Sequence, residues 1–358
     1  MIAYSTPEKQ IEKLKSQGLI IENETLAKQY LEFYGYSNLI KSYRSPYMTG
    51  IDETGTKCYK QGVTFNQILS LYTLDKNLRN AVMAAMQDLE EHIKAVAADI
   101  VAFSFGTHQD DYLRYKNYRN RRKRKQRFSL THLLNIMEET LKTDKDPIHH
   151  YMQEHGAVPP WILFKSVYFG TIVNFIDQFK DSERSAMAHK LFDDSIFLHL
   201  DDTHSMKLMM NILFMANEYR NVAAHGGRIY NYECKSKLRI DEIFVNAHND
   251  AEEKLSMFIQ LLFLLHLLKY KAPFERLNTT LGNEVNRHCK QYPQDLDYLR
   301  KVTNAPLKAK HFVYFSGSSN IFHFDQHCSG MKDAQKIELA EAFDKGFSPC
   351  KRCAKVNK

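Results

Sequence analysis

The sequence has no apolar run long enough to cross a bilayer. Its most apolar stretch, Leu255–Leu268, has 14 residues and includes Ser256, Gln260 and His266, whereas a transmembrane helix needs about 20 predominantly apolar residues. Met1–Lys15 is polar and helix-like rather than an apolar run after a basic start, so we expect no secretory signal. We therefore predict a cytoplasmic protein without a membrane partner.

Cysteine is also scarce, with six residues in a chain of 358. Cys58, Cys234 and Cys289 are scattered, whereas Cys328, Cys350 and Cys353 lie near the C-terminal end. In a chain for which no secretory signal is expected, this distribution favours reduced thiols and a bound metal over a set of disulfides.

Acidic residues are absent from one strongly basic segment. Residues 115–127, which we call the basic segment, contain eight Lys and Arg and no acid, while the whole chain has a net charge of +7. The rest of the protein is therefore nearly neutral. A cluster of cations between Tyr112, Tyr115, Tyr118 and Phe128 suits RNA phosphates with bases stacked on the rings. The alternative is a solvated loop. The predicted RNA-binding cations are Lys116, Arg119, Arg121, Arg122, Lys123, Arg124, Lys125 and Arg127.

Glycine and proline are missing from Val63–Phe105, where apolar residues recur at steps of three, four and seven. This spacing predicts a long amphipathic helix, either continuous or broken once. Alternating, strand-like runs are scarce before residue 300. We therefore predict a mainly α fold, a helical bundle, with all-helical structure up to residue 275. Further helical patterns lie at Leu130–Leu141, Trp161–Phe179, Ser205–Ala224 and Ala251–Tyr270.

The character of the sequence changes after Lys310. His311–Phe315 and Asn320–Phe324 can form short strands around a turn, and Asp333–Asp344 has the pattern of a short helix. This indicates a small α/β module. The predicted domains are a helical domain over 1–275, a connector over 276–305 and a zinc-binding module over 306–358.

The zinc prediction rests on His323-x4-Cys328-x21-Cys350-x2-Cys353. Two thiolates in Cys-x2-Cys can bind one ion, and one His with three Cys is a common tetrahedral Zn²⁺ site. Four protein ligands leave no open position, so we expect a structural zinc ion and no cofactor for catalysis. His327, next to Cys328, is an alternative to His323.

A second motif ends the helix predicted over Met206–His225. Asn221 and His225 are four residues apart and lie on one face; Arg220 adjoins them, and Gly226-Gly227 ends the helix. A histidine can transfer protons near neutral pH, and an arginine can stabilise charge on a phosphate. These residue types suit metal-independent RNA cleavage. Because the reaction needs both a base and an acid, we expect a homodimer that supplies two such histidines.

The spacing by itself is weak support. Arg-x4-His also occurs at Arg127/His132 and Arg184/His189, and a histidine at a helix C-terminus is favourable for electrostatic reasons alone. The surroundings distinguish the copy at Arg220, because Asn follows the arginine and Gly-Gly-Arg-Ile-Tyr-Asn follows the histidine.

Arg220–Asn231 resembles the Arg-Asn-x3-His signature of the HEPN superfamily, and more narrowly that of the Abi-like group of abortive-infection proteins (the AbiD and AbiF relatives). The resemblance extends over about residues 5–270. It departs at Tyr230, where many relatives carry Trp, and at Lys165-Ser166, where an acidic residue is common. The other segments that carry it are Thr6–Leu19, Tyr72–Arg79 with Asp88–Glu91, and Val158–Ile162 with Phe169–Thr171.

The resemblance implies a phage-defence or toxin-like protein that cleaves or binds RNA, with a small non-coding RNA as a further partner. His225 would then transfer protons, Arg220 would stabilise phosphate charge and Asn221 would position the RNA. Arg228 and Asn231 would contact phosphate or brace the helix end. The alternative is a non-catalytic RNA-binding protein with the same residues. A DNA-directed regulator ranks last, because no helix-turn-helix pattern is present.

The C-terminal segment Phe343–Cys353 resembles the end of the metal-binding domain of the Ada alkyl-repair proteins, over about the last 45 residues. That family has two cysteines in the first half of the domain, and a histidine replaces one of them here, so alkyl transfer is not expected. Contact with nucleic acid or protein is expected instead, helped by Lys351, Arg352, Lys355 and Lys358.

Overall fold

A computed structural model describes residues 4–51, 57–121, 123–198, 200–235, 258–303, 305, 312–317, 319–323, 325–328, 331, 333–338, 341–342 and 345–352. The chain forms two compact units. The terminal unit comprises Met1–Leu74, Leu281–Arg300 and Pro306–Lys358, and the central unit comprises Asp75–Thr280 and Lys301–Ala305. Among the described residues, no helix combines the length and the apolar character that a membrane crossing requires.

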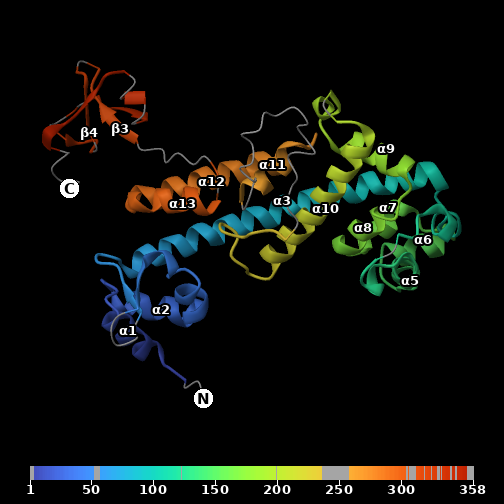
Figure 1. The fold of residues 1–358 in the computed structure, drawn as a ribbon, viewed down its shortest axis with the longest axis horizontal. Coiled ribbons are helices and arrows are strands. Elements are labelled where there is room, and N and C mark those ends of the chain that lie inside the picture. Colours follow the sequence, from blue (N-terminus) through green and yellow to red (C-terminus); the bar gives the residue numbers. More distant parts are fainter. Residues whose placement is uncertain are drawn as a thin grey trace. The chain divides into compact units, whose positions relative to one another are not determined.

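Helix α3 (Phe65–Phe105) is the long helix predicted from the missing glycine and proline. It is continuous over 41 residues (Figure 1). Its apolar stripe is buried, with Leu78, Val82 and Ile93 fully inaccessible to solvent. The mainly helical fold predicted from the sequence is confirmed by this helix and by the others along the chain.

In the central unit, α10 (Asp202–Ala224) packs against α8 (Phe169–Ile176), α9 (Asp181–Leu191) and α11 (Phe258–His266). The α10 helix begins at Asp201, whose carboxylate accepts a hydrogen bond from the backbone N–H of His204 at 2.8 Å, as an N-cap residue should. Phe169, Phe175 and Tyr219 are buried in the core of this unit. The remaining elements are α4 (Gln109–Tyr112), η3 (Tyr115–Asn117), η4 (Gln126–Phe128), α5 (Leu130–Leu141), α6 (Ile148–His155), α7 (Pro160–Ser166) and η5 (Asp194–Leu198).

The terminal unit contains a buried polar network between segments that are distant in the sequence. Asp295 accepts hydrogen bonds from the Tyr47 hydroxyl at 2.7 Å and from Gln67 Nε2 at 3.0 Å, and lies 2.9 Å from His288 Nε2. The other His288 ring nitrogen lies 2.9 Å from the Ser70 hydroxyl. Besides its strands, this unit contains α1 (Pro7–Ser16), α2 (Glu24–Tyr34), η1 (Ser37–Lys41), η2 (Ser45–Tyr47) and η6 (Pro293–Asp295), with the start of α3 and parts of α12 (Ala272–Gln291) and α13 (Leu296–Thr303).

A small antiparallel sheet lies in the part of the chain that we predicted to be all-helical. Strands β1 (Met48–Ile51) and β2 (Lys57–Tyr59) pair with each other. The prediction missed them because three or four residues are too few to show the alternation of a strand. The domain boundaries at 275 and 305 stay predictions, although α12 continues across residue 275.

The C-terminal module is a four-stranded sheet with the strand order β5-β3-β4-β6. Two strands were predicted here, but the helix predicted over Asp333–Asp344 is wrong, because Gln335–Glu338 forms strand β5. Pairing with the edge of β3, which buries Ile337, overrides the local helical pattern. The bounds are β3 (Phe312–Phe315), β4 (Ile321–His323), β5 (Gln335–Glu338) and β6 (Ser348–Pro349), with β4 parallel to β6 and the other pairs antiparallel.

Candidate functional site

The C-terminal end of α10 is closed by its two glycines. Gly227 N–H donates to the Val222 carbonyl at 2.9 Å and Gly226 N–H to the Ala223 carbonyl at 3.3 Å, which together form a Schellman motif. Gly226 has φ +70°. A Cβ on Gly227 would lie 2.6 Å from Val222 Cγ1, so the chain can turn here only with glycine. His225 is consequently the C-cap residue that follows the last helical residue, Ala224, at the start of a sharp reversal.

Two residues of α3 hold the loop that follows. The Asp75 carboxylate, which is fully buried, accepts hydrogen bonds from the backbone N–H groups of Ile229 at 2.8 Å and Tyr230 at 2.9 Å. One turn later, Arg79 donates to the carbonyls of Gly226 at 2.9 Å and Gly227 at 3.3 Å. The loop is therefore fixed at both of its ends to one rigid helix.

This loop and the end of α10 enclose a pocket of about 620 Å³. Asn221, His225, Arg228 and Asn231 all line it. The first three have exposed side chains. Four of the five residues predicted from the motif thus share one solvent-accessible pocket, which we call the helix-end pocket. This arrangement places a histidine and a guanidinium where a ligand from solvent can reach both.

Arg220 is not one of the residues that line the helix-end pocket. Its Nε lies 3.8 Å from Glu90 Oε2 on α3, an ion pair that is too long for a hydrogen bond. Successive residues of a helix are about 100° apart, so Arg220 and Asn221 leave α10 in different directions. Glu90 also pairs with Lys94 at 2.7 Å.

Sequence reasoning missed the two acids that line the helix-end pocket, Glu218 and Glu233. Glu218 lies beside Asn221 and His225, accepts a hydrogen bond from the backbone N–H of Lys235 at 2.9 Å, and also binds the Tyr232 hydroxyl. Burial, followed by the bond to Glu218, raises the pKa of Tyr232 well above its usual value. Helical spacing was the available signal, because Glu218 stands three residues before Asn221 and seven before His225.

Six cations of the basic segment form two groups, and Arg121 is half-buried and belongs to neither. Arg119 pairs with Asp181 at 2.6 Å and Lys123 pairs with Asp177; burial, with Arg121 and Arg184 nearby, lowers the pKa of Lys123. The second group has exposed side chains and no ion pair within the described part of the chain. Arg122 lies outside the described residues. The second group consists of Lys116, Arg124, Lys125 and Arg127.

The stacking role predicted for Tyr112 and Tyr118 is wrong. Both rings are buried, and Tyr118 packs against Phe175 at a ring-centroid distance of 4.6 Å. The Tyr112 hydroxyl donates to the Val158 carbonyl at 2.6 Å, and Tyr118 donates to the Tyr112 carbonyl. These rings therefore anchor the basic segment to the core, and Tyr115 is the ring that is exposed, by 47%.

The copy of Arg-x4-His at Arg127 and His132 also lies in a pocket, of about 270 Å³, at the start of α5. A second pocket of about 1020 Å³ continues from His132 along α5, where acidic residues and a lysine line it. His132 is therefore the natural comparison for His225 in any functional test.

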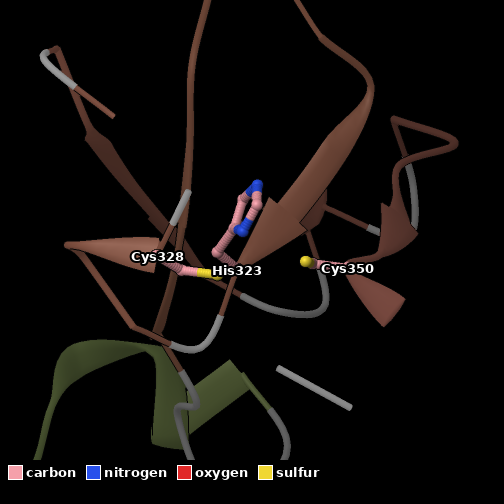
Figure 2. A group of neighbouring side chains, drawn as sticks. All are labelled: His323, Cys328 and Cys350. Carbon is pink, nitrogen blue, oxygen red and sulfur yellow. The ribbon is translucent and has the colours of Figure 1, made fainter. Parts of the chain in front are cut away.

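His323, Cys328 and Cys350 come together in the C-terminal module (Figure 2). Their ligand atoms lie within 4.8 Å of one another. His327 is exposed and is not part of this group. Cys353 lies outside the described residues.

Residues 29–231 match the family described as Abi-like protein. The match covers more than half of the chain, includes the basic segment and ends at Asn231 in the helix-end pocket. It does not reach the C-terminal module. No curated protein matches the chain, and no solved structure does.

Proposed function

Because this chain belongs to the Abi-like protein family, which points to abortive-infection defence against phage, we propose that it acts on RNA at the helix-end pocket. The proposed activity is that of a metal-independent endoribonuclease of the HEPN type, working in the cytoplasm. One observation carries the proposal: Asn221, His225 and Arg228 line a single exposed pocket at a rigidly held helix end.

The chemistry follows from these side chains. His225 takes the proton of a ribose 2′-OH, whose oxygen attacks the adjacent phosphorus. Arg228 binds the phosphate oxygens and stabilises the charge that develops on them. The P–O bond to the 5′ oxygen breaks, and that oxygen takes up a proton. The products are a 2′,3′-cyclic phosphate and a 5′-hydroxyl, with Asn221 and Asn231 positioning the RNA.

Arg220 can contact RNA only when its ion pair with Glu90 opens. Its ion pair with Glu90 is 3.8 Å long and partly exposed, and such pairs stabilise a fold by only about 0–1 kcal/mol. An RNA phosphate beside the helix end competes with Glu90 for the guanidinium. We assign Arg220 to a second phosphate contact that forms when RNA binds.

A homodimer supplies the second proton-transfer group. One chain offers one histidine in the helix-end pocket, whereas cleavage needs a base for the 2′-OH and an acid for the leaving oxygen. His225 and Arg228 are exposed and thus accessible to a second copy. A small non-coding RNA bound along the basic segment is the proposed regulator.

The test compares the wild-type chain with His225→Ala and His132→Ala on end-labelled RNA in EDTA. We expect wild-type cleavage that leaves cyclic-phosphate ends, and a rate at least about 100-fold lower for His225→Ala, the usual contribution of a general acid or base. His132→Ala should cleave normally, and His225→Ala should still bind RNA.

The alternative is an RNA-binding protein without catalysis. The pairing of Arg220 with Glu90 favours it, because this guanidinium does not line the helix-end pocket. It predicts a discrete RNA that co-purifies with the chain and that no preparation cuts. That result, or cleavage that depends on His132 instead of His225, overturns the proposed active site.

A further inference from the structure

The parallel pairing of β4 and β6 brings two potential metal ligands side by side. Phe322 lies opposite Pro349 in the register of these strands, and Cys350 N–H donates to the Phe322 carbonyl at 2.9 Å. His323 and Cys350 each follow that pair by one residue. Both side chains are buried, with 7% and 9% of their surface exposed.

A tight turn adds the third ligand. After β4, the Asp325 carboxylate accepts a hydrogen bond from His327 N–H at 2.9 Å, and the Asp325 carbonyl accepts one from Cys328 N–H at 3.2 Å. The turn directs Cys328 toward His323 and Cys350 (Figure 2). All three ligand atoms lie within 4.8 Å of one another.

We propose that His323, Cys328 and Cys350 bind one zinc ion. Zn–S distances near 2.3 Å and Zn–N distances near 2.0–2.1 Å, in tetrahedral geometry, place ligand atoms roughly 3.6–3.8 Å apart, which the observed grouping reaches with small side-chain movements. Two thiolates and an imidazole select zinc over magnesium or calcium, which prefer oxygen ligands. The sequence predicts Cys353 as the fourth ligand, and Cys353 lies outside the described residues.

The ion stabilises the module, whose described residues form a small hydrophobic cluster. The hydrophobic cluster of its described residues comprises Val313, Phe322, Ile337 and Ala342, with Phe315 and Phe347 packed against it. A core of this size is far below what a domain needs for independent stability, and a structural metal is the usual substitute. The free energy of metal binding then contributes directly to the folding of the module. This inference does not depend on the proposed RNA activity, because the three ligands lie outside the helix-end pocket and outside the family match, which ends at residue 231.

The experiment measures zinc in the full-length chain by mass spectrometry after purification without chelators. We expect one zinc ion per chain, and loss of the metal in His323→Gln and in Cys350→Ser. His327→Gln is the matched control, because His327 is an exposed imidazole next to Cys328, and it should keep the metal. The wild-type chain refolded with Co²⁺ should show thiolate-to-cobalt absorption, a measurement that does not depend on any variant folding.

Three results would overturn the inference. They are a wild-type chain that stays free of metal when zinc is supplied, a cobalt form without thiolate absorption, and equal metal loss in His327→Gln and His323→Gln.

Discussion

Asp75 shows how a single buried residue shapes the helix-end pocket. Its carboxylate accepts hydrogen bonds from two backbone N–H groups, those of Ile229 and Tyr230, in the reversal after α10. Arg79, one turn further along α3, satisfies the carbonyls of Gly226 and Gly227. Arg228 and Asn231 are attached to this braced stretch of chain, so their positions in the pocket depend on a residue that does not line it.

Asp75→Ala should destabilise the protein by about 2–4 kcal/mol, because it leaves two buried N–H groups without acceptors. Asp99→Ala is the matched control on the same helix. Asp99 is exposed and, among the described residues, pairs with Lys190 alone, so this change should lower the free energy of unfolding by at most about 1 kcal/mol. Urea unfolding measures both. Equal effects of the two changes would show that Asp75 does not hold the loop.

At the residue scale, helical spacing correctly predicted which side chains of α10 lie on the same face. Asn221 and His225, four residues apart, do share a pocket. Spacing does not report the direction of a flexible side chain, so the pairing of Arg220 with Glu90, 130 positions earlier in the chain, was not foreseen. The same limit explains Tyr112 and Tyr118, whose burial depends on backbone carbonyls and rings contributed by other helices.

At the scale of elements, the basic segment is both a structural connector and a charged surface. Arg119 pairs with Asp181 at the start of α9, and Lys123 pairs with Asp177 at the end of α8. Of the exposed cations, Lys116 precedes these anchors in the chain, and Arg124, Lys125 and Arg127 follow them before α5 begins. Composition predicted the charge of this segment, but the acids Asp181 and Asp177 decide which of its cations are paired within the fold.

Four exposed cations are replaced by alanine: Lys116, Arg124, Lys125 and Arg127. This change should weaken binding to RNA of any sequence. For each phosphate that is no longer neutralised, the slope of log K against log salt should become shallower by about 0.7 for single-stranded RNA. The charge-matched control replaces Lys9, Lys13, Lys41 and Lys57, which are also exposed. Fluorescence anisotropy over a range of KCl concentrations measures the slopes. If both variants show the same decrease in affinity and in slope, the segment is only a solvated surface.

At the scale of the whole molecule, helix content was predictable and the division into units was not. Long apolar stripes without glycine or proline identify α3 and α10 directly. The terminal unit, however, joins residues from both ends of the chain, and it does so through contacts such as Tyr47 with Asp295, 248 positions apart. Hydrophobic periodicity is local, and so it carries no information about such pairings. Strand β5, which exists through its pairing with β3, was mistaken for a helix for the same reason.

The Asp295 network should make stability depend on acid pH. Burial opposes ionisation of this carboxyl, but hydrogen bonds from His288, Tyr47 and Gln67 outweigh it and lower the pKa below the usual 3.8. A carboxyl with a lowered folded-state pKa stabilises the fold above its unfolded pKa and loses that contribution as the pH falls through its folded pKa. The loss should therefore begin near pH 4 and continue below it.

Asp295→Asn should accordingly lower stability at pH 7 and flatten the pH dependence between about pH 5 and pH 2. Asp297→Asn is the control two residues away, since Asp297 is 91% exposed and pairs with Arg300. Thermal unfolding across this pH range measures both. A pH profile of Asp295→Asn that matches the wild type would show that the network is not ionised as described.

The most direct test of the central claim, that this Abi-like protein defends cells by cutting RNA at the helix-end pocket, is to map RNA ends in infected cells. Phage-infected cells that express the wild-type chain should accumulate new 5′-hydroxyl ends and release fewer phage. Cells that express His225→Ala at the same level should show neither effect. Phage restriction that persists in His225→Ala cells without new RNA ends would contradict the claim.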